Sequence, residues 1–293
     1  SNDTEANFLY VNEGQPGTPL FTESAMVRGV AFDRDGLAQA CMGIGVADVN
    51  GDQLLDIFVA NFYKEFNVLY EQMPGGFFTE VSRQCGLAEP SLLLLTFGAA
   101  FVDLDLDGLP DIVVTNGHVD DFSKDGIPYH MPPSVFSNRG GRFFMLTESC
   151  GPFFQGAYLG RGIALVDANR DGKGDWVISH LDSPAALLEN RTEPVGNFLK
   201  LAFVGTQSHR DAIGTTCWVT VGDRTLMQQL VGGCGYFNCN ERNLLFGLGT
   251  ARKADRIEVH WPSGLRHTFH DVPANESYQL VEGQTELHVQ PLR

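Results

Sequence analysis

Three segments of this chain repeat one pattern of apolar and acidic residues, and they align without a gap. Each is an apolar run, an acidic turn and a second apolar run, which predicts two antiparallel strands joined by a hairpin. The first acidic residues, Asp48, Asp103 and Asp167, are 55 and 64 residues apart. Such periods are close to those of β-propeller blades and longer than those of leucine-rich repeats. The segments are residues 43–61, 98–116 and 162–180.

A second unit recurs between the acidic segments. It is clearest at residues 7–10 with 21–23 and at 67–70 with 78–80; 135–138 with 146–148 is a degenerate copy, and 187–190 is a partial one. Two strands from each unit make a four-stranded blade. Gly, Pro and Asn interrupt the short apolar runs and helical periodicity is hard to find, so we expect an all-β fold. Residues 1–191 are predicted to form a partial β-propeller of about three blades.

The first copy of the second unit, at Asn7, has no acidic loop before it. A propeller closes by pairing its last blade with its first, and about three blades leave strand edges that invite association. We therefore expect the edges near residues 7–10 and 187–190 to contact missing propeller blades or other protein subunits.

The acidic turns have the composition of metal-binding loops. Positions 1, 3, 5 and 9 of each carry an oxygen side chain, and position 7 would offer its carbonyl. Oxygen ligands on a tight loop suit Ca²⁺ ahead of Mg²⁺, and the lack of nitrogen and sulfur ligands disfavours zinc and copper. The sequence thus predicts about three Ca²⁺ ions. The predicted ligands are Asp48, Asn50, Asp52, Leu54 and Asp56 in loop 1, Asp103, Asp105, Asp107, Leu109 and Asp111 in loop 2, and Asp167, Asn169, Asp171, Lys173 and Asp175 in loop 3.

These loops differ from an EF-hand, whose position 12 is a bidentate Glu. Position 12 here is Val59, Val114 or Ile178, inside the second apolar run. The alternative is a polar hairpin turn, because Asp, Asn and Gly favour turns without any metal. Three loops in register, each with four oxygen side chains, favour the metal. Position 6 is glycine in loops 2 and 3 but Gln53 in loop 1.

The repeat resembles the FG-GAP or VCBS family, the blade type of integrin α-subunit propellers, over about residues 7–190. The resemblance implies that calcium sits at the blade hairpin. There it would have a structural role, joining strands by neutralising carboxylates.

A different pattern begins at Asn197, after a linker at residues 192–196 that contains Pro and Gly. Six or seven short apolar runs are separated by turns at Gly and Asp, and no acidic loop recurs. This spacing predicts a small β-sandwich or barrel over residues 197–293.

The C-terminal stretch resembles the ASPIC/UnbV domain, which follows VCBS-type repeats in cartilage acidic protein and in bacterial surface or periplasmic proteins. The resemblance rests on residues 210–214 (RDAIG), 246–249 (FGLG) and 259–264 (VHWPSG), with residues 29–43 and 116–118 upstream. It implies an extracellular, cell-surface or periplasmic protein of the cartilage acidic protein-like, bacterial type.

Charge and cysteine content limit the classes of partner. Thirty-six acidic residues oppose 20 basic ones, a net charge of −16, which disfavours nucleic acid. No apolar run is long enough to span a bilayer; the longest, residues 91–102, is interrupted by Thr96 and Gly98. The six cysteines match no zinc or haem pattern, and Cys234 and Cys239 are either a disulfide or free thiols.

No catalytic motif is present: the sequence has no GxSxG, HExxH or glycine-rich phosphate loop. We therefore expect no enzyme but a calcium-binding adhesion or scaffold protein that contacts proteins or glycans. The alternative is a polysaccharide-acting hydrolase or lyase that uses the propeller face. Residues 119–133, with Asp120, Tyr129 and His130, form the candidate binding loop, although a solvated connection would look the same.

Overall fold

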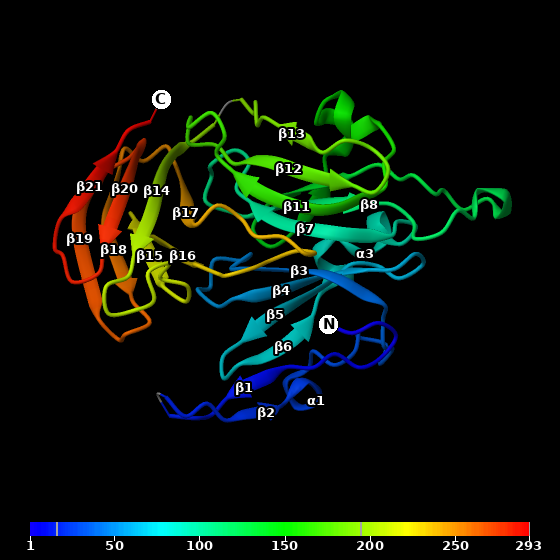
Figure 1. Ribbon diagram of the computed structural model, residues 1–293, viewed down its shortest axis with the longest axis horizontal. Coiled ribbons are helices and arrows are strands. Elements are labelled where there is room, and N and C mark those ends of the chain that lie inside the picture. The colour runs from blue at the N-terminus through cyan, green and yellow to red at the C-terminus, as the bar shows by residue number, and fades with distance from the viewer. Residues whose placement is uncertain (16, 194, 293) are drawn as a thin grey trace.

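The computed structural model describes residues 1–15, 17–193 and 195–292. In it the predicted all-β fold is confirmed: four sheets fan out along the N-terminal part of the chain, and two more form a separate C-terminal layer pair (Figure 1). None of the helices in the described residues is long and apolar enough to cross a bilayer.

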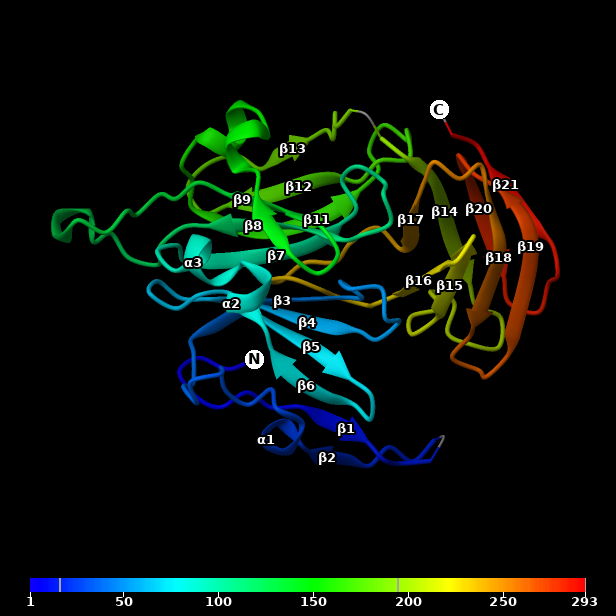
Figure 2. The ribbon, with the colours of Figure 1, turned by 180° about the vertical axis from the view of Figure 1, so that it is seen from behind.

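The N-terminal part has a propeller arrangement (Figures 1 and 2). A two-stranded sheet, β1–β2, is followed by two four-stranded sheets in simple up-and-down order and by a three-stranded one. The strands are β1 (Tyr10–Asn12), β2 (Phe21–Glu23), β3 (Cys41–Ala47), β4 (Asp56–Asn61), β5 (Val68–Met73), β6 (Phe77–Glu80), β7 (Thr96–Val102), β8 (Asp111–Asn116), β9 (Ser134–Asn138), β10 (Phe143–Met145), β11 (Gly160–Val166), β12 (Asp175–His180) and β13 (Ala186–Leu188).

Short helices connect these sheets. The α-helices are single turns between strands. Of the 3-10 helices, η1 lies between β8 and β9, and η2 and η3 lie between β10 and β11. They are α1 (Ala25–Arg28), α2 (Ser82–Cys85), α3 (Ala88–Ser91), η1 (Ser123–Asp125), η2 (Thr147–Ser149) and η3 (Pro152–Gln155).

The central strands explain why the acidic segments read as continuous apolar runs. Phe58 in β4 packs into a cluster shared with the second four-stranded sheet, whereas the next residue, Val59, packs toward α1 and the chain before it. In β8, Ile112 faces the first of these clusters and Val113 faces the cluster shared with β11 and β12. Alternate side chains of a strand point to opposite faces, so a blade between two neighbours needs apolar residues at every position.

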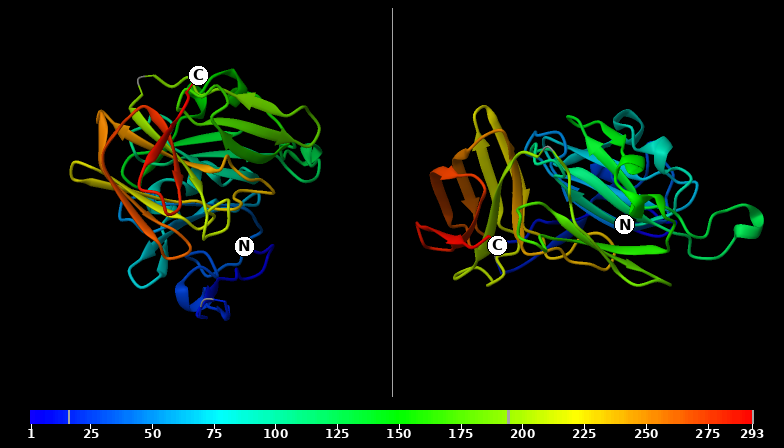
Figure 3. Two further views of the ribbon diagram at one scale, coloured as in Figure 1. Left: turned by 60° about the vertical axis from the view of Figure 1, so that its left-hand side comes forward. Right: turned by 90° about the horizontal axis from the view of Figure 1, so that it is seen from above.

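The C-terminal module is a β-sandwich (Figure 3). One sheet has the order β17-β14-β20-β21 and the other β16-β15-β18-β19, with β14 and β20 paired in parallel. The strands are β14 (Asn197–Val204), β15 (Thr216–Val221), β16 (Arg224–Gln229), β17 (Asn243–Gly249), β18 (Lys253–His260), β19 (Arg266–Pro273), β20 (Glu276–Val281) and β21 (Leu287–Gln290).

Residues 231–242, which make up most of the connection between β16 and β17, leave the sandwich and cross the inner strands of the propeller; they are called the arm below (Figure 1). Gly235 exchanges two backbone hydrogen bonds with Ile44 of β3, and Glu241 N–H donates to the carbonyl of Leu165 in β11. The Tyr236 ring lies 4.9 Å from that of Phe97 in β7. The arm therefore touches all three inner strands. Its two cysteines, at 234 and 239, are free thiols.

A fragment that begins at Asn197 should fold without calcium. The buried apolar cluster of the sandwich is drawn entirely from residues 199–280, so its core does not need the propeller. Circular dichroism of the fragment in chelator should show a β spectrum and a cooperative melt. A random-coil spectrum would contradict this boundary between the modules.

Candidate metal loops at the blade hairpins

The three acidic segments form the hairpins that join β3 to β4, β7 to β8 and β11 to β12, the first two strands of three propeller sheets. Position 9 opens the second strand in every case and pairs with the last residue of the first: Asp56 with Ala47, Asp111 with Val102, and Asp175 with Val166. All three loops thus have the same register. Val59, Val114 and Ile178, at position 12, are buried inside the strands and cannot reach an ion.

Two backbone positions in each loop are left-handed. Position 4 has a φ of 80° at Gly51, 58° at Leu106 and 60° at Arg170. Position 6 has a φ of 68° at Gln53, and Gly108 and Gly172 share the same region. Gln53 therefore adopts the conformation that glycine takes in the other two loops, and loop 1 keeps their course.

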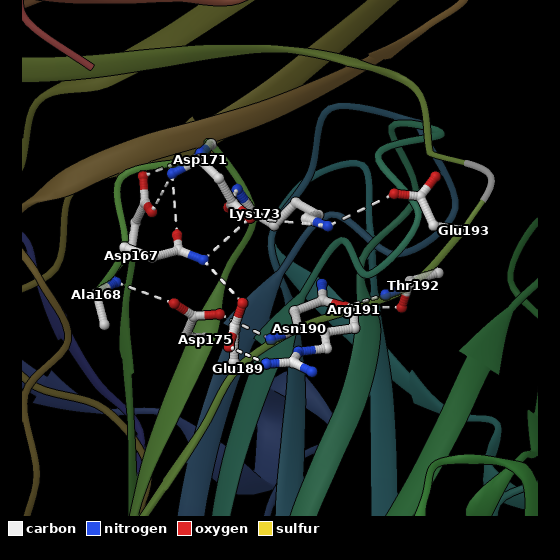
Figure 4. A network of polar contacts seen from close by, with 12 residues as sticks. Asp167, Ala168, Asp171, Lys173, Asp175, Glu189, Asn190, Arg191, Thr192 and Glu193 are labelled. Atoms are coloured by element: carbon white, nitrogen blue, oxygen red, sulfur yellow. Dashed lines mark hydrogen bonds and ion pairs between the residues drawn. The ribbon is translucent and has the colours of Figure 1, made fainter. Parts of the chain in front are cut away.

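The first Asp of each loop is a buried acceptor for the loop backbone. In loop 2, one Asp103 oxygen accepts from the N–H of Asp107 at 3.0 Å, and the other accepts from Gly108 at 2.8 Å. Asp48 accepts in the same way from Asp52 at 3.1 Å and from Gln53 at 2.9 Å. These bonds hold the carboxylate toward the centre of the turn. Asp167 does the same in loop 3 (Figure 4).

The Asp at position 9 ties the hairpin to the rest of its sheet. Asp111 Oδ2 accepts from the N–H of Leu104 at 3.0 Å, and its Oδ1 accepts from Asn138 in β9 at 2.7 Å. Asp56 and Asp175 make the equivalent pairs of bonds. Asp56 is fully buried, and Asp111 and Asp175 nearly so. Each of these carboxylates is therefore fixed by two backbone donors.

Buried carboxylates at one turn are electrostatically unfavourable without a cation. Burial raises the pKa of the Asp48, Asp103 and Asp175 carboxyls above the ordinary value, and it raises the pKa of Asp56 and of Asp111 to about 7. Neighbouring carboxylates of the same loops add to this effect. A bound divalent cation would remove the penalty.

Loop 2 has the donor set that fits a hard cation best. One oxygen each of Asp103, Asp105 and Asp111 lie within 4.8 Å of one another. Asp107 is half-buried beside them, and its carboxyl also has a raised pKa, caused first by burial. In loops 1 and 3, Asn50 and Asn169 replace the carboxylate of Asp105 with an amide oxygen. These side chains would hold Ca²⁺, which supplies positive charge and links the turn to the strand that follows it.

Asparagines from the next blade support the loops, and the sequence interpretation gave them no role. Asn138 Nδ2 donates to the carbonyl of Val49, at position 2 of loop 1, at 2.8 Å. Asn190 Nδ2 donates to Leu104, at the same position of loop 2, at 3.0 Å. Their recurrence in the second unit of the repeat was the available signal. The partner, one blade earlier, was not visible from the sequence.

Loop 2 also contacts the linker and the C-terminal module through three successive carbonyls. Asp105, Leu106 and Asp107 accept hydrogen bonds from Gly196 N–H at 2.7 Å, Gly249 N–H at 2.8 Å and the Arg224 guanidinium at 2.9 Å. A cleft of about 490 Å³ lies between the loops and the sandwich. Its lining includes Asp48, Asp103, Asp167, Lys200, Arg224 and Glu241.

The candidate binding loop, residues 119–133, projects from the propeller between β8 and β9 (Figures 1 and 2). The rings of Tyr129 and His130 meet at 5.1 Å, and His130 Nε2 lies 2.8 Å from Asp182. The exposed Asp120 does not join them: its backbone N–H donates to the buried imidazole of His118. The structure thus brings together two of the three residues.

His260 and Ser263, three residues apart, contact different carboxylates. The Ser263 hydroxyl donates to Glu282, whereas His260 Nε2 lies 2.9 Å from Glu258.

Two family models match the chain. The model for an FG-GAP-like repeat covers residues 48–114, which include loops 1 and 2, and the model named ASPIC and UnbV covers residues 205–287. Residues 48–114 are thus similar to an FG-GAP-like repeat, and residues 205–287 to an ASPIC/UnbV domain. This confirms the resemblance drawn from the sequence motifs, and the second match lies within the β-sandwich.

Known proteins extend the comparison. Cartilage acidic protein 1 of Xenopus tropicalis is 27% identical over 274 residues, which is 90% of this chain and 39% of that protein. Among solved structures, the exotype rhamnogalacturonan lyase YesX is similar with a TM-score of 0.30 and 15% identity, over 83% of this chain and 50% of the lyase. The rhamnogalacturonan lyase YesW has a TM-score of 0.29 and 9% identity, over 91% and 53%.

Proposed function

We propose that this FG-GAP/ASPIC-UnbV chain is a calcium-binding scaffold or adhesion module that acts by binding and not by catalysis. The observation that carries the proposal is the convergence of Asp103, Asp105 and Asp111 on one point of loop 2. Three carboxylates held this close repel one another unless a cation lies between them. Loops 1 and 3 repeat its register, its left-handed backbone positions and the backbone hydrogen bonds of its first and last Asp, so the proposed stoichiometry is about three Ca²⁺.

Calcium at these positions would act structurally. Each loop joins two strands of its own sheet, and loops 1 and 2 also accept a hydrogen bond from the next blade. An ion there would fix the stacking of the blades. The module would then present its surfaces to other proteins, and possible ligands on those surfaces include glycans.

The N-terminal hairpin is the surface that best fits a partner. Within the part of the chain that the structure describes, β1 and β2 pair only with each other, and the exposed apolar side chains around them include Phe8, Tyr10, Phe21 and Val27. A strand edge with apolar neighbours favours pairing with a further strand. We propose that another propeller blade or another protein subunit supplies it, in an extracellular, cell-surface or periplasmic setting.

Titration calorimetry tests the calcium proposal directly. The purified protein, freed of metal by a chelator, should bind about three Ca²⁺, and Asp107→Ala should weaken one of the sites at least tenfold because it removes a carboxylate from loop 2. Glu286→Ala, which removes an exposed acidic residue that does not line the cleft beside the loops, is the control and should leave all sites unchanged. An isotherm without binding, together with no metal by elemental analysis, contradicts the proposal.

A further inference from the structure

Loop 3 differs from the other two loops because a lysine ammonium touches its first carboxylate. Lys200 Nζ, from β14 of the sandwich, lies 3.1 Å from Asp167 Oδ2. The Lys200 side chain is 9% exposed and that of Asp167 is 3% exposed. Among the described residues, no ion pair joins a carboxylate of loop 1 or loop 2 to a lysine or arginine of the C-terminal module.

A second residue of the module completes the contact. Glu241, in the arm, accepts from the Lys200 ammonium at 3.2 Å and from the backbone N–H of Asp167 at 3.0 Å. Two carboxylates therefore share one ammonium: Asp167 and Lys200 are buried, and the Glu241 side chain is 39% exposed. Burying the Asp167–Lys200 pair is tolerated only because its charges are paired.

The three loops differ in which later segment of the chain contacts them. Loop 1 is supported by Asn138 and loop 2 by Asn190, each from the next blade. Behind loop 3, the chain enters the sandwich at β14 instead of another acidic segment. Lys200 and Glu241 contact loop 3 at its first residue, Asp167, and bring a cation in place of a neutral amide, whereas the asparagines contact position 2 of loops 1 and 2.

Loop 3 has a further lysine at position 7. Lys173 Nζ lies 3.7 Å from Asp171 and 3.8 Å from Glu193, at the outer side of the turn (Figure 4). Loop 2, in contrast, has four carboxylates at positions 1, 3, 5 and 9. The two loops therefore differ in net charge as well as in their first carboxylate.

We propose that Lys200 is the resident cation of loop 3. Its ammonium neutralises part of the negative charge of Asp167 that Ca²⁺ would otherwise neutralise. In this way it couples calcium binding at loop 3 to docking of the C-terminal module. The inference rests on the proposed function, because it assumes that the loops bind calcium. An ammonium a few ångströms from a divalent ion repels it, so loop 3 is the weakest site. Without calcium, the same ammonium keeps the sandwich attached to the last blade.

The test compares Lys200→Met with Lys253→Met in the full chain. Lys253 pairs with the exposed Asp255 and Asp271 on the sandwich, far from the loops in sequence. Each variant removes one lysine charge, so the two variants have the same net charge. In calorimetry, Lys200→Met should raise the affinity of one calcium site about tenfold or more. In melting experiments, it should lower the midpoint in chelator by more than Lys253→Met does, and saturating calcium should remove most of that difference.

Charge-retaining and partial variants make the result independent of packing damage. Lys200→Arg should bind calcium as the wild type does, because it keeps the charge. Lys200→Gln, which retains a hydrogen-bond donor, should show the affinity gain if Lys200→Met does not fold. The inference is overturned if the neutral variants bind calcium with the wild-type isotherm and their melting midpoint falls equally in chelator and in calcium. That result would leave the calcium sites of the wild type unaffected. A wild-type chain that binds no calcium overturns the proposed function itself.

Discussion

Removal of calcium should lower the unfolding midpoint of the propeller part by roughly 10 °C or more. Each site at a calcium concentration of about 100 times its Kd contributes about 2.7 kcal/mol to the free energy of unfolding. In a domain of this size, 1 kcal/mol shifts Tm by about 2–4 °C. The physical reason is that folded loops gather carboxylates that the unfolded chain keeps apart. Differential scanning calorimetry in chelator and at increasing free calcium measures the shift. Because the two modules can melt separately, the transition that moves should be the one absent from the fragment that starts at Asn197.

The pH dependence without calcium should have the opposite sign to ordinary acid unfolding. The pKa of Asp56 and of Asp111 is raised to about 7 by burial, above the value of about 4 in an unfolded chain. A raised pKa in the folded state means that protonation favours folding, so this contribution is lost as pH rises through 7. In chelator, the midpoint should therefore be higher at pH 6 than at pH 8.

Calcium provides the control for this measurement. An ion bound to the loops keeps the carboxylates charged at both pH values, so the difference between pH 6 and pH 8 should shrink when calcium is saturating. Equal pH responses with and without calcium would mean that the loops do not carry the ion. A midpoint that is insensitive to chelator would lead to the same conclusion.

The sequence predicted the loops well because their information is local. Residues 43–61, and the two equivalent stretches of nineteen residues, contain the turn residues, the oxygen side chains and the apolar runs on both sides. The pairing of Ala47 with Asp56 follows from that stretch alone. The same reasoning predicted six or seven strands in the C-terminal module, where the structure has eight; the unpredicted one is β21, whose short run, Leu287–Gln290, is half polar.

Contacts between distant segments were out of reach. Nothing in the sequence of the arm indicated a distant partner, yet Gly235 bonds to Ile44, almost two hundred residues earlier. Lys200 alternates with apolar residues in β14 and looks like an exposed position of a half-buried strand, but it is 7% exposed and faces Asp167. A local pattern records which side of a strand is polar, not what lies against that side.

The glycine of the acidic loops does not always stand at the same position. Loop 1 has Gln53 at position 6, where loops 2 and 3 have glycine, but it has its glycine at position 4, where loops 2 and 3 have Leu106 and Arg170. Each loop therefore places at least one of its two left-handed positions on glycine. Comparing all nine positions of the three loops, and not position 6 alone, would have found this compensation.

Replacement of Glu282 by alanine should destabilise the C-terminal module by about 2–3 kcal/mol, because it leaves several half-buried donors without their charged acceptor. Glu282 is 2% exposed and follows β20. Its Oε2 accepts from three successive backbone N–H groups, those of Thr206, Gln207 and Ser208, each at 2.7 Å. Its Oε1 accepts from the hydroxyls of Ser208 and Ser263.

This carboxylate joins two of the segments on which the ASPIC/UnbV resemblance rests. Ser208 precedes the RDAIG segment, residues 210–214, and Ser263 lies in VHWPSG, residues 259–264. Burial alone would raise the pKa of Glu282, but hydrogen bonds from Ser263, Ser208 and Thr206 lower it to about 2. A lowered pKa in the folded state stabilises the fold above the unfolded value, near 4.3, and this contribution is lost as pH falls toward 2.

Two variants separate the charge of Glu282 from its shape. Glu282→Gln keeps the size but has one acceptor oxygen in place of two, so it should lose part of the stability and most of the pH dependence between 5 and 3. Glu286→Gln, at an exposed position nearby, should change stability by less than about 0.5 kcal/mol. Denaturant unfolding of the 197–293 fragment at pH 7 and at pH 4 measures both effects. If Glu282→Gln and Glu286→Gln behave alike, the five hydrogen bonds do not hold the two segments together, and their proximity must come from the apolar core beneath them.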